Sequence, residues 1–276
     1  MKKLLLAVLG VSLFLGALGV NASPEQDRKE ILELYKNKFP NIKFDDYVNG
    51  ALNLSPDALQ QYRSIMEFPP FDSEVDRGKK MWETPFKNGK KYADCYPNGG
   101  KNIAGHYPYF DERLGKVVTY EKSINACRQS NGEEEYAYDD MKTMGLLTAY
   151  SRSLSDGMKM SVKVEGPKAL AAYEKGKEFF YQRRGQLNFS CAHCHMQQVG
   201  STLRTELLSP ALGHAVHWPE FRGGDSLVTL QTRYVQCNRQ VRAQPFKQGG
   251  DEYNNLEYFH SYISNGLPMQ APVFRK

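Results

Sequence analysis

Apolar residues recur at intervals of three and four positions along two stretches, one near the middle of the chain and one near its end. This spacing places them on one face of a helix, so it predicts helices over 144–154 and 256–263. Each pattern runs into a glycine, Gly157 or Gly266, and glycine is a common helix stop. The apolar positions are Met144, Leu147, Tyr150 and Leu154 in the first stretch and Leu256, Phe259 and Ile263 in the second.

These helices close two copies of one sequence unit. The copies open alike, with RGKKMW at 77–82 and KGKEFF at 175–180, and they close alike, with LSDGMKM at 154–160 and ISNGLPM at 263–269. Between these landmarks the cysteines fall in register, because Cys95 and Cys127 of the first copy match Cys194 and Cys237 of the second. Landmarks that repeat in the same order indicate an internal duplication.

The first 22 residues read as a leader rather than as part of the fold. Lys2 and Lys3 precede an apolar run from Leu4 to Val20, and Ala22 ends a small-residue cleavage site. This is the pattern of a secretory signal peptide. The alternative is an uncleaved anchor, although the run is near the lower length limit for a membrane span. We expect an exported protein in an oxidising compartment, with no membrane segment after cleavage.

Composition narrows the class of protein further. The 276 residues are 41% hydrophobic and 24% charged, which is typical of a globular chain. The net charge of +5, less the two leader lysines, leaves +3, too little to indicate a nucleic-acid partner. Five cysteines are too few for a disulfide-stapled scaffold.

The strongest chemical signal is Cys191-Ala192-His193-Cys194-His195. This C-x-x-C-H motif is typical of c-type haem attachment, with two thioether cysteines and a proximal histidine ligand. A redox C-x-x-C pair and half of a zinc site are the alternatives, but the chain has no second such pair. The motif therefore predicts one covalently bound haem c, held by Cys191, Cys194 and His195.

The first copy lacks the motif, because Tyr92 and Tyr96 stand where the first cysteine and the histidine would be. In an oxidising compartment its two cysteines are expected to pair, so we predict a disulfide between Cys95 and Cys127. Two buried free thiols are the alternative.

The expected fold is mainly α, with two tandem cytochrome c-like domains of which the first has no haem. The expected divisions are a signal peptide at 1–22, an N-terminal extension at 23–70, a haem-less domain at 71–165 and a haem-binding domain at 166–276. Leu32, Leu34, Tyr35 and Phe39 suggest a helix in the extension, which we expect to pack on the first domain. We expect structural roles for His106, His214, His217 and His260.

Cys237 is left unpaired, in the segment that covers the distal face of the haem in a cytochrome c domain. A thiolate is a good iron ligand and a good nucleophile, and Arg233, Arg239 or Arg242 could hold an oxyanion beside it. Met269 is the rival iron ligand, although the first copy keeps Met160 at the matching place without a haem. An inert core cysteine is the third possibility.

Over nearly the whole mature chain, these residues resemble the SoxA family of bacterial sulfur oxidation. The resemblance rests on the duplicated plan, on the haem motif at 191–195, and on Arg233 four residues before Cys237 in RYVQCNRQ. It implies a periplasmic L-cysteine S-thiosulfotransferase that forms a heterodimer with the cytochrome SoxX. The enzyme would join thiosulfate oxidatively to a cysteine of the carrier SoxYZ, and the electrons would leave through the haems of SoxA and SoxX.

Carried over by motif, the resemblance implies roles for individual residues. Cys237 would be both the distal haem ligand and the catalytic nucleophile, and Arg233 would bind substrate. Tyr92 and Tyr96 depart from the two-haem members of the family, so this chain resembles the one-haem form. The alternative function is a one-haem electron carrier with His195 and Met269 as ligands, which has no need of the arginine–cysteine pair.

Overall fold

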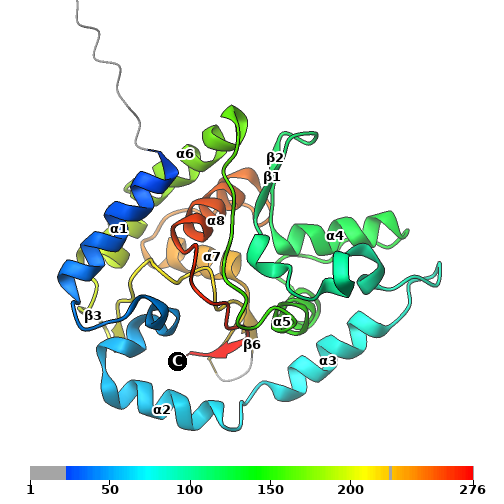
Figure 1. Cartoon of the computed structure of the whole chain (residues 1–276), viewed down its shortest axis with the longest axis horizontal. Coiled ribbons are helices and arrows are strands. Elements are labelled where there is room, and N and C mark those ends of the chain that lie inside the picture. The colour runs from blue at the N-terminus through cyan, green and yellow to red at the C-terminus, as the bar shows by residue number, and fades with distance from the viewer. Residues whose placement is uncertain (1–22, 224–225, 276) are drawn as a thin grey trace, which may run out of the picture.

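The structure, a computed structural model, describes residues 23–223 and 226–275, so the predicted leader lies outside the described residues. The fold is mainly helical, as predicted, with short hairpins between the helices (Figure 1). Among the described residues no helix has both the length and the apolar character needed to cross a membrane. The N-terminal extension contributes α1 (Pro24–Lys38), η1 (Phe44–Leu54) and α2 (Pro56–Met66).

The first repeat begins with a helix and ends with a helix that packs against it. Between them lie three short turns, a hairpin, and a helix that carries Cys127. In order, its elements are α3 (Asp72–Glu83), η2 (Tyr92–Cys95), η3 (Pro97–Gly100), η4 (Ala104–His106), β1 (Tyr109–Asp111), β2 (Lys116–Val118), α4 (Tyr120–Ser130), η5 (Met141–Gly145) and α5 (Leu146–Ser153).

The second repeat follows the same overall plan, with an opening helix, a hairpin, a helix that carries Cys237 and a closing helix, but it has a second short hairpin, β3–β4, between the haem motif and β5. Its hairpin β5–β6 gains a parallel third strand, β7, from the C-terminus, so that the strand order is β6-β5-β7. In order, its elements are α6 (Pro167–Tyr181), η6 (His193–Gln197), β3 (Thr202–Leu203), β4 (Glu206–Leu207), β5 (Glu220–Arg222), β6 (Ser226–Val228), α7 (Leu230–Gln240), α8 (Asp251–Ile263) and β7 (Val273–Phe274).

The two glycines that mark the opening helices lie at helix crossings. A Cβ on Gly78 would overlap the carbonyl oxygen of Leu146 on α5, and a Cβ on Gly176 would overlap the carbonyl oxygen of Asn255 on α8. Only a residue without a side chain lets the two backbones approach so closely. The opening and closing helices therefore cross in the same way in both repeats.

The closing segments of the two repeats pair with each other. The amide of Gly157 donates to the carbonyl of Met269 at 2.8 Å, and the amide of Gly266 donates to the carbonyl of Met160 at 2.9 Å. Each methionine then enters the core of the opposite repeat. Met269 packs with Trp82 and Tyr96 in the first repeat, while Met160 belongs to the core of the second.

The N-terminal extension contains the predicted helix, but the expectation that it packs on the first domain was wrong for its greater part. Ile31 and Tyr35 of α1 are buried in the core of the second repeat, together with Tyr47 of η1. Helix α1 lies beside α6 (Figure 1), and Asp27 pairs there with Lys177 at 2.7 Å. The apolar side chains of α1 are buried against α6 and α8 of the second repeat, because burial of apolar surface away from water is favourable.

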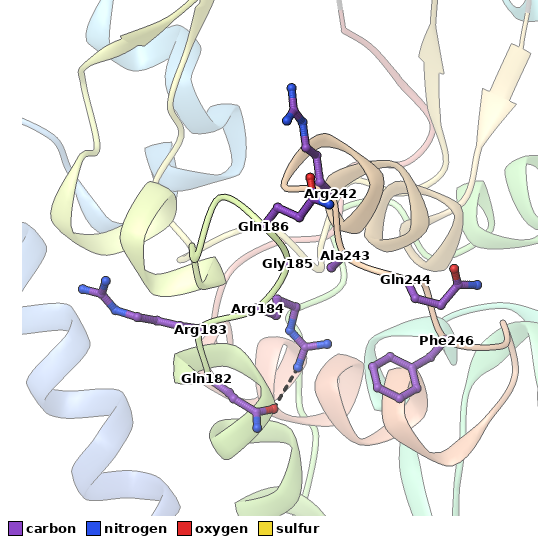
Figure 2. A pocket seen from close by; sticks show the side chains of 9 residues that line it. All are labelled: Gln182, Arg183, Arg184, Gly185, Gln186, Arg242, Ala243, Gln244 and Phe246. Atoms are coloured by element: carbon purple, nitrogen blue, oxygen red, sulfur yellow. Dashed lines mark hydrogen bonds between the residues drawn. The ribbon is translucent and has the colours of Figure 1, made fainter.

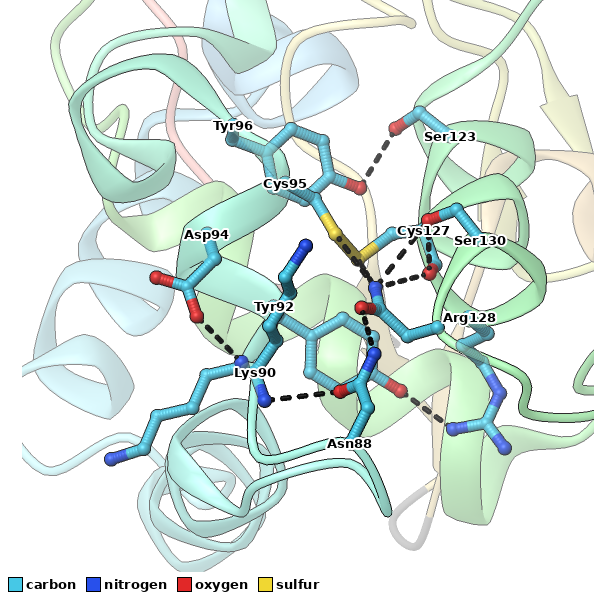
Figure 3. The surroundings of a disulfide bond; sticks show 12 residues. Asn88, Lys90, Tyr92, Asp94, Cys95, Tyr96, Ser123, Cys127, Arg128 and Ser130 are labelled. Atoms are coloured by element: carbon cyan, nitrogen blue, oxygen red, sulfur yellow. Dashed lines mark hydrogen bonds between the residues drawn. A yellow bond between two sulfur atoms is a disulfide. The ribbon is translucent and has the colours of Figure 1, made fainter.

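The first repeat is closed by the predicted disulfide between Cys95 and Cys127, whose Cα atoms are 5.8 Å apart (Figure 3). Tyr92 and Tyr96 lie on Trp82, with ring centroids 5.4 and 5.5 Å away and interplanar angles of 15° and 16°. Arg128 donates to the Tyr92 hydroxyl at 2.8 Å, which satisfies the polar end of a buried ring. An aromatic stack and a disulfide thus fill this core.

Candidate haem and sulfur-transfer site

The haem motif lies on a short helical turn that widens into η6. The imidazole of His195 donates from Nδ1 to the carbonyl oxygen of Ser209 at 2.9 Å, which leaves Nε2 as the nitrogen that can bind a metal. Burial lowers the pKa of His195 to about 4, with Arg233 acting in the same direction and the bond to Ser209 against it. The ring is therefore neutral at physiological pH, as an iron ligand must be.

Three unpaired cysteines gather at this turn, and none of them is fully exposed. Burial raises the pKa of Cys191 to about 12, and the next cause is the neighbouring Cys237. Burial and Cys237 also raise the pKa of Cys194. Cys237 therefore lies within electrostatic reach of both motif cysteines, although it is more than 40 residues away in the sequence.

Helix α7 presents Cys237 to the motif. Thr229 caps its first turn by accepting from the amide of Thr232, as Thr119 does for α4 of the first repeat. Arg233 precedes Cys237 by one helical turn, so the two side chains share one face of the helix. The influence of Arg233 on His195 places its charge on the side of the haem motif.

The other two arginines named in the sequence analysis lie elsewhere. Arg239 is turned by about 200° from Cys237 around the helix, and with Val235 it lines a pocket of about 660 Å³ against residues 135–139 of the first repeat. Arg242 lines a second pocket, of about 470 Å³, where its side chain points away from Arg184 (Figure 2). Arg233 is the arginine that shares the face of Cys237.

Met269 does not lie with the haem motif. Its side chain is 1% exposed and packs in the aromatic core of the first repeat. This position removes it as a partner for His195, and it explains why both copies keep a methionine at the closing turn. Each one fills the core of the other repeat.

The donor set suits a haem better than a directly bound metal ion. Within residues 23–223 and 226–275 no group of three or more His, Cys, Asp or Glu side chains is arranged to hold a metal ion. A haem brings four nitrogen ligands of its own, so it needs from the protein only axial ligands and the two thioether cysteines. Cys191, Cys194 and His195 could supply the attachment, and Cys237 could supply a second axial sulfur.

Sequence reasoning missed Ser209, which holds the motif in place. Ser209 accepts the His195 bond through its carbonyl oxygen, and its hydroxyl pairs with Nε2 of His214 at 2.7 Å. The His214 ring meets the His195 ring edge-on, with centroids 4.4 Å apart. A serine carbonyl carries no motif, so no pattern in the sequence marks this partner.

Comparisons with known proteins show which family the chain resembles. A family model described as the SoxA/TsdA cytochrome c domain matches residues 77–160. The chain is 42% identical to the L-cysteine S-thiosulfotransferase subunit SoxA of Allochromatium vinosum over 274 residues, which cover 98% of this chain and 96% of that relative. This chain belongs to the SoxA family. The family model covers the repeat without the C-x-x-C-H motif, so that repeat keeps the sequence character of a cytochrome c domain.

Two further matches support this membership in the SoxA family. The SoxA subunit of Chlorobaculum tepidum is 44% identical over 253 residues, which cover 91% of this chain and 88% of that protein. A chain in the crystal structure of SoxXA from P. pantotrophus superposes with a TM-score of 0.71 at 30% identity, covering 79% of this chain and 84% of that one. A SoxA-family cytochrome implies haem c as the cofactor.

Proposed function

We propose that this chain is the catalytic subunit of an L-cysteine S-thiosulfotransferase. It would carry one haem c on the unit at 166–276, attached through Cys191 and Cys194 with His195 as the proximal ligand. Its substrates are thiosulfate and a cysteine of the carrier SoxYZ, and its partner is SoxX in a periplasmic heterodimer. The observation that carries the proposal is that Arg233 and Cys237 share the face of α7 beside the haem motif.

Arg233 holds the sulfonate end of thiosulfate, because a guanidinium can donate two parallel hydrogen bonds to an oxyanion. This directs the outer sulfur of thiosulfate toward Cys237. The haem, when bound, supplies an electron acceptor and an iron that can take the Cys237 sulfur as a ligand. The unit at 71–165 has no part in this chemistry and serves as a structural domain.

The reaction balances in two steps. The Cys237 thiolate and the outer sulfur of thiosulfate form an S–S bond, and two electrons leave the sulfur pair for the SoxX cytochrome. The carrier thiol then loses its proton and attacks the outer sulfur, which breaks the new bond and regenerates the Cys237 thiolate. The products are the carrier S-thiosulfonate, one proton and two electrons.

The test compares variants of α7 in the SoxX complex. Arg233→Gln should raise the thiosulfate KM by roughly 10- to 100-fold, the cost of a lost charge-assisted contact. Arg239→Gln removes the same charge from the other side of the helix and should stay within about twofold. Cys237→Ser should abolish transfer to the carrier.

The competing function is electron transfer alone. The buried place of Met269 in the first repeat disfavours the His/Met ligation that this alternative needs. Electron paramagnetic resonance separates His/thiolate from His/Met haem, and mass spectrometry of the mature chain counts the haems. A His/Met signal in a protein that transfers no thiosulfate to the carrier would leave only the electron carrier, whereas full transfer activity in Cys237→Ser would remove Cys237 as the nucleophile.

A further inference from the structure

We propose that Tyr35, which lies on α1 outside both repeats, is a positioning residue for the haem ligand His195. It acts by joining the backbone of the haem motif to the segment that orients the imidazole. This inference rests on the proposed role of His195 as the proximal ligand. It gives the N-terminal extension a part in the haem site.

The contacts of Tyr35 are specific. Its side chain is fully buried, and its hydroxyl donates to the backbone carbonyl of His195. The same hydroxyl accepts from the amide of Ala211 at 2.9 Å, and this amide also reaches the His195 carbonyl at 2.9 Å. One hydroxyl thus closes a ring of hydrogen bonds between the motif and residues 209–211.

The segment that Tyr35 fastens is the one that supplies the acceptor for the imidazole. The carbonyl oxygen of Ser209, two residues before Ala211, accepts a hydrogen bond from Nδ1 of His195 at 2.9 Å. Both ends of that hydrogen bond are therefore held by one side chain from α1. Lys38, at the end of α1, adds a second contact to the turn by donating to the carbonyl of Gln197 at 3.0 Å.

Helix α1 can act as a fixed support because it is itself anchored away from the motif. Asp27 receives hydrogen bonds from Lys177 at 2.7 Å and from the hydroxyl of Tyr173 at 3.1 Å, both on α6. Tyr173 is as fully buried as Tyr35. The two tyrosines thus both tie α1 to the second repeat, but of the two only Tyr35 bonds to the haem motif.

The bond from a ligand histidine to a carbonyl makes the imidazole a stronger donor, which stabilises oxidised iron. Without the Tyr35 hydroxyl, the Ala211 amide alone joins the two segments through the His195 carbonyl, so the bond between His195 and Ser209 is held less firmly and weakens. The reduction potential of the haem should then rise, and the ring should take a less uniform orientation.

The experiment compares Tyr35→Phe with Tyr173→Phe in the full-length, haem-loaded protein. Both variants lose one buried hydroxyl that docks α1, so the melting temperature should fall by a similar amount in each. Only Tyr35→Phe should show a higher reduction potential of the haem and shifted or broadened lines in its electron paramagnetic resonance spectrum. Haem content is measured first, and its selective loss in Tyr35→Phe would support the same role, because attachment needs the motif held in place.

Equal changes in potential, g-values or haem content in the two variants would reduce Tyr35 to a residue that docks α1, and would overturn the inference. So would a Tyr35→Phe protein with a wild-type spectrum and potential. A wild-type protein with no haem on Cys191 and Cys194, or with no histidine ligand, refutes the proposed function instead. The two failures are therefore distinct.

Discussion

The two repeats share one frame and differ in what fills it. In each, an opening helix crosses a closing helix at a glycine, and a threonine-capped helix carries the last cysteine of the repeat. In the first repeat the matched cysteines, Cys95 and Cys127, are bonded to each other. In the second their counterparts, Cys194 and Cys237, are both free.

The difference follows from two positions in the haem motif. Cys191 and His195 of the second repeat correspond to Tyr92 and Tyr96 of the first, and these tyrosines stack on Trp82. Rings of this size supply the buried apolar area that a small domain needs. The frame without the C-x-x-C-H motif is thus stabilised by aromatic packing and a crosslink, while the cysteines of the copy with the motif stay free.

Among the changes that test the difference between the two repeats, Trp82→Ala should have the largest effect on stability. Removing the ring at the centre of the stack should lower the free energy of unfolding by about 3–5 kcal/mol, the usual cost of a large aromatic-to-alanine change in a core. Denaturant titration followed by circular dichroism measures it, and Trp82→Phe should lose much less. The haem spectrum should not change, so a spectral shift in Trp82→Ala would contradict the separation of the two cores.

Removing the crosslink comes next. The Cys95→Ala/Cys127→Ala protein should lose about 3–4 kcal/mol, because the disulfide closes a loop with a sequence separation of 32 and so restricts the unfolded chain. Thermal unfolding with and without a reductant measures the loss, and only the wild type should respond to the reductant. Sulfur transfer at temperatures below the melting point should remain; its disappearance would mean that the first repeat takes part in the chemistry.

The two crossing glycines test whether the frames are equivalent. Gly78→Ala and Gly176→Ala each force two helices apart, and each should cost about 1–3 kcal/mol by overpacking. Only Gly176→Ala should also alter the haem spectrum, since α6 leads directly to the motif. Lys175→Ala, on the exposed side of α6, is the control. Equal spectra in the two glycine variants would show that the helix crossing does not shape the haem site.

A smaller effect is expected at a buried acid of the closing helix α8. Burial, together with the nearby Glu121, raises the pKa of Glu257 to about 8. The matching residue of the first repeat is Thr148, which does not titrate. The folded protein keeps the proton that the unfolded chain loses above pH 4.5, so the stabilising contribution is complete at low pH and is lost as the pH rises toward 8.

Between pH 5 and pH 8 the wild type should therefore lose free energy of unfolding that Glu257→Gln keeps. The difference between the two proteins should be at least about 1 kcal/mol. A glutamine oxygen can still accept the bond that Gln231 now donates at 3.0 Å. Unfolding curves at the two pH values measure the difference, and Glu252→Gln, an exposed change on the same helix, should show none. An unchanged pH dependence in Glu257→Gln would mean that its carboxylate is ionised in the folded state.

Particular residues show how far sequence patterns reached. The paired landmarks predicted the closing helices and the matched cysteines, and the missing motif in the first copy predicted the Cys95–Cys127 disulfide. The patterns left Arg239 and Arg242 open as partners of Cys237, because the face of a helix depends on how it is packed. The sequence patterns also put the extension on the wrong repeat. The spacing of apolar residues in a helix shows which of its faces is apolar, but not which surface of the protein will cover that face.

Residue identity along the chain determined the C-x-x-C-H motif, its absence from the first copy and the repeated landmarks, because these are local features of residue spacing and helical period. Tertiary packing alone decided that Met269 lies in the core of the first repeat, that the charge of Arg233 lies within electrostatic reach of His195, and that the Ser209 carbonyl and the Tyr35 hydroxyl both bond to His195. Each of these depends on the contact of segments far apart in sequence, through backbone carbonyls and buried hydroxyls that no short motif specifies.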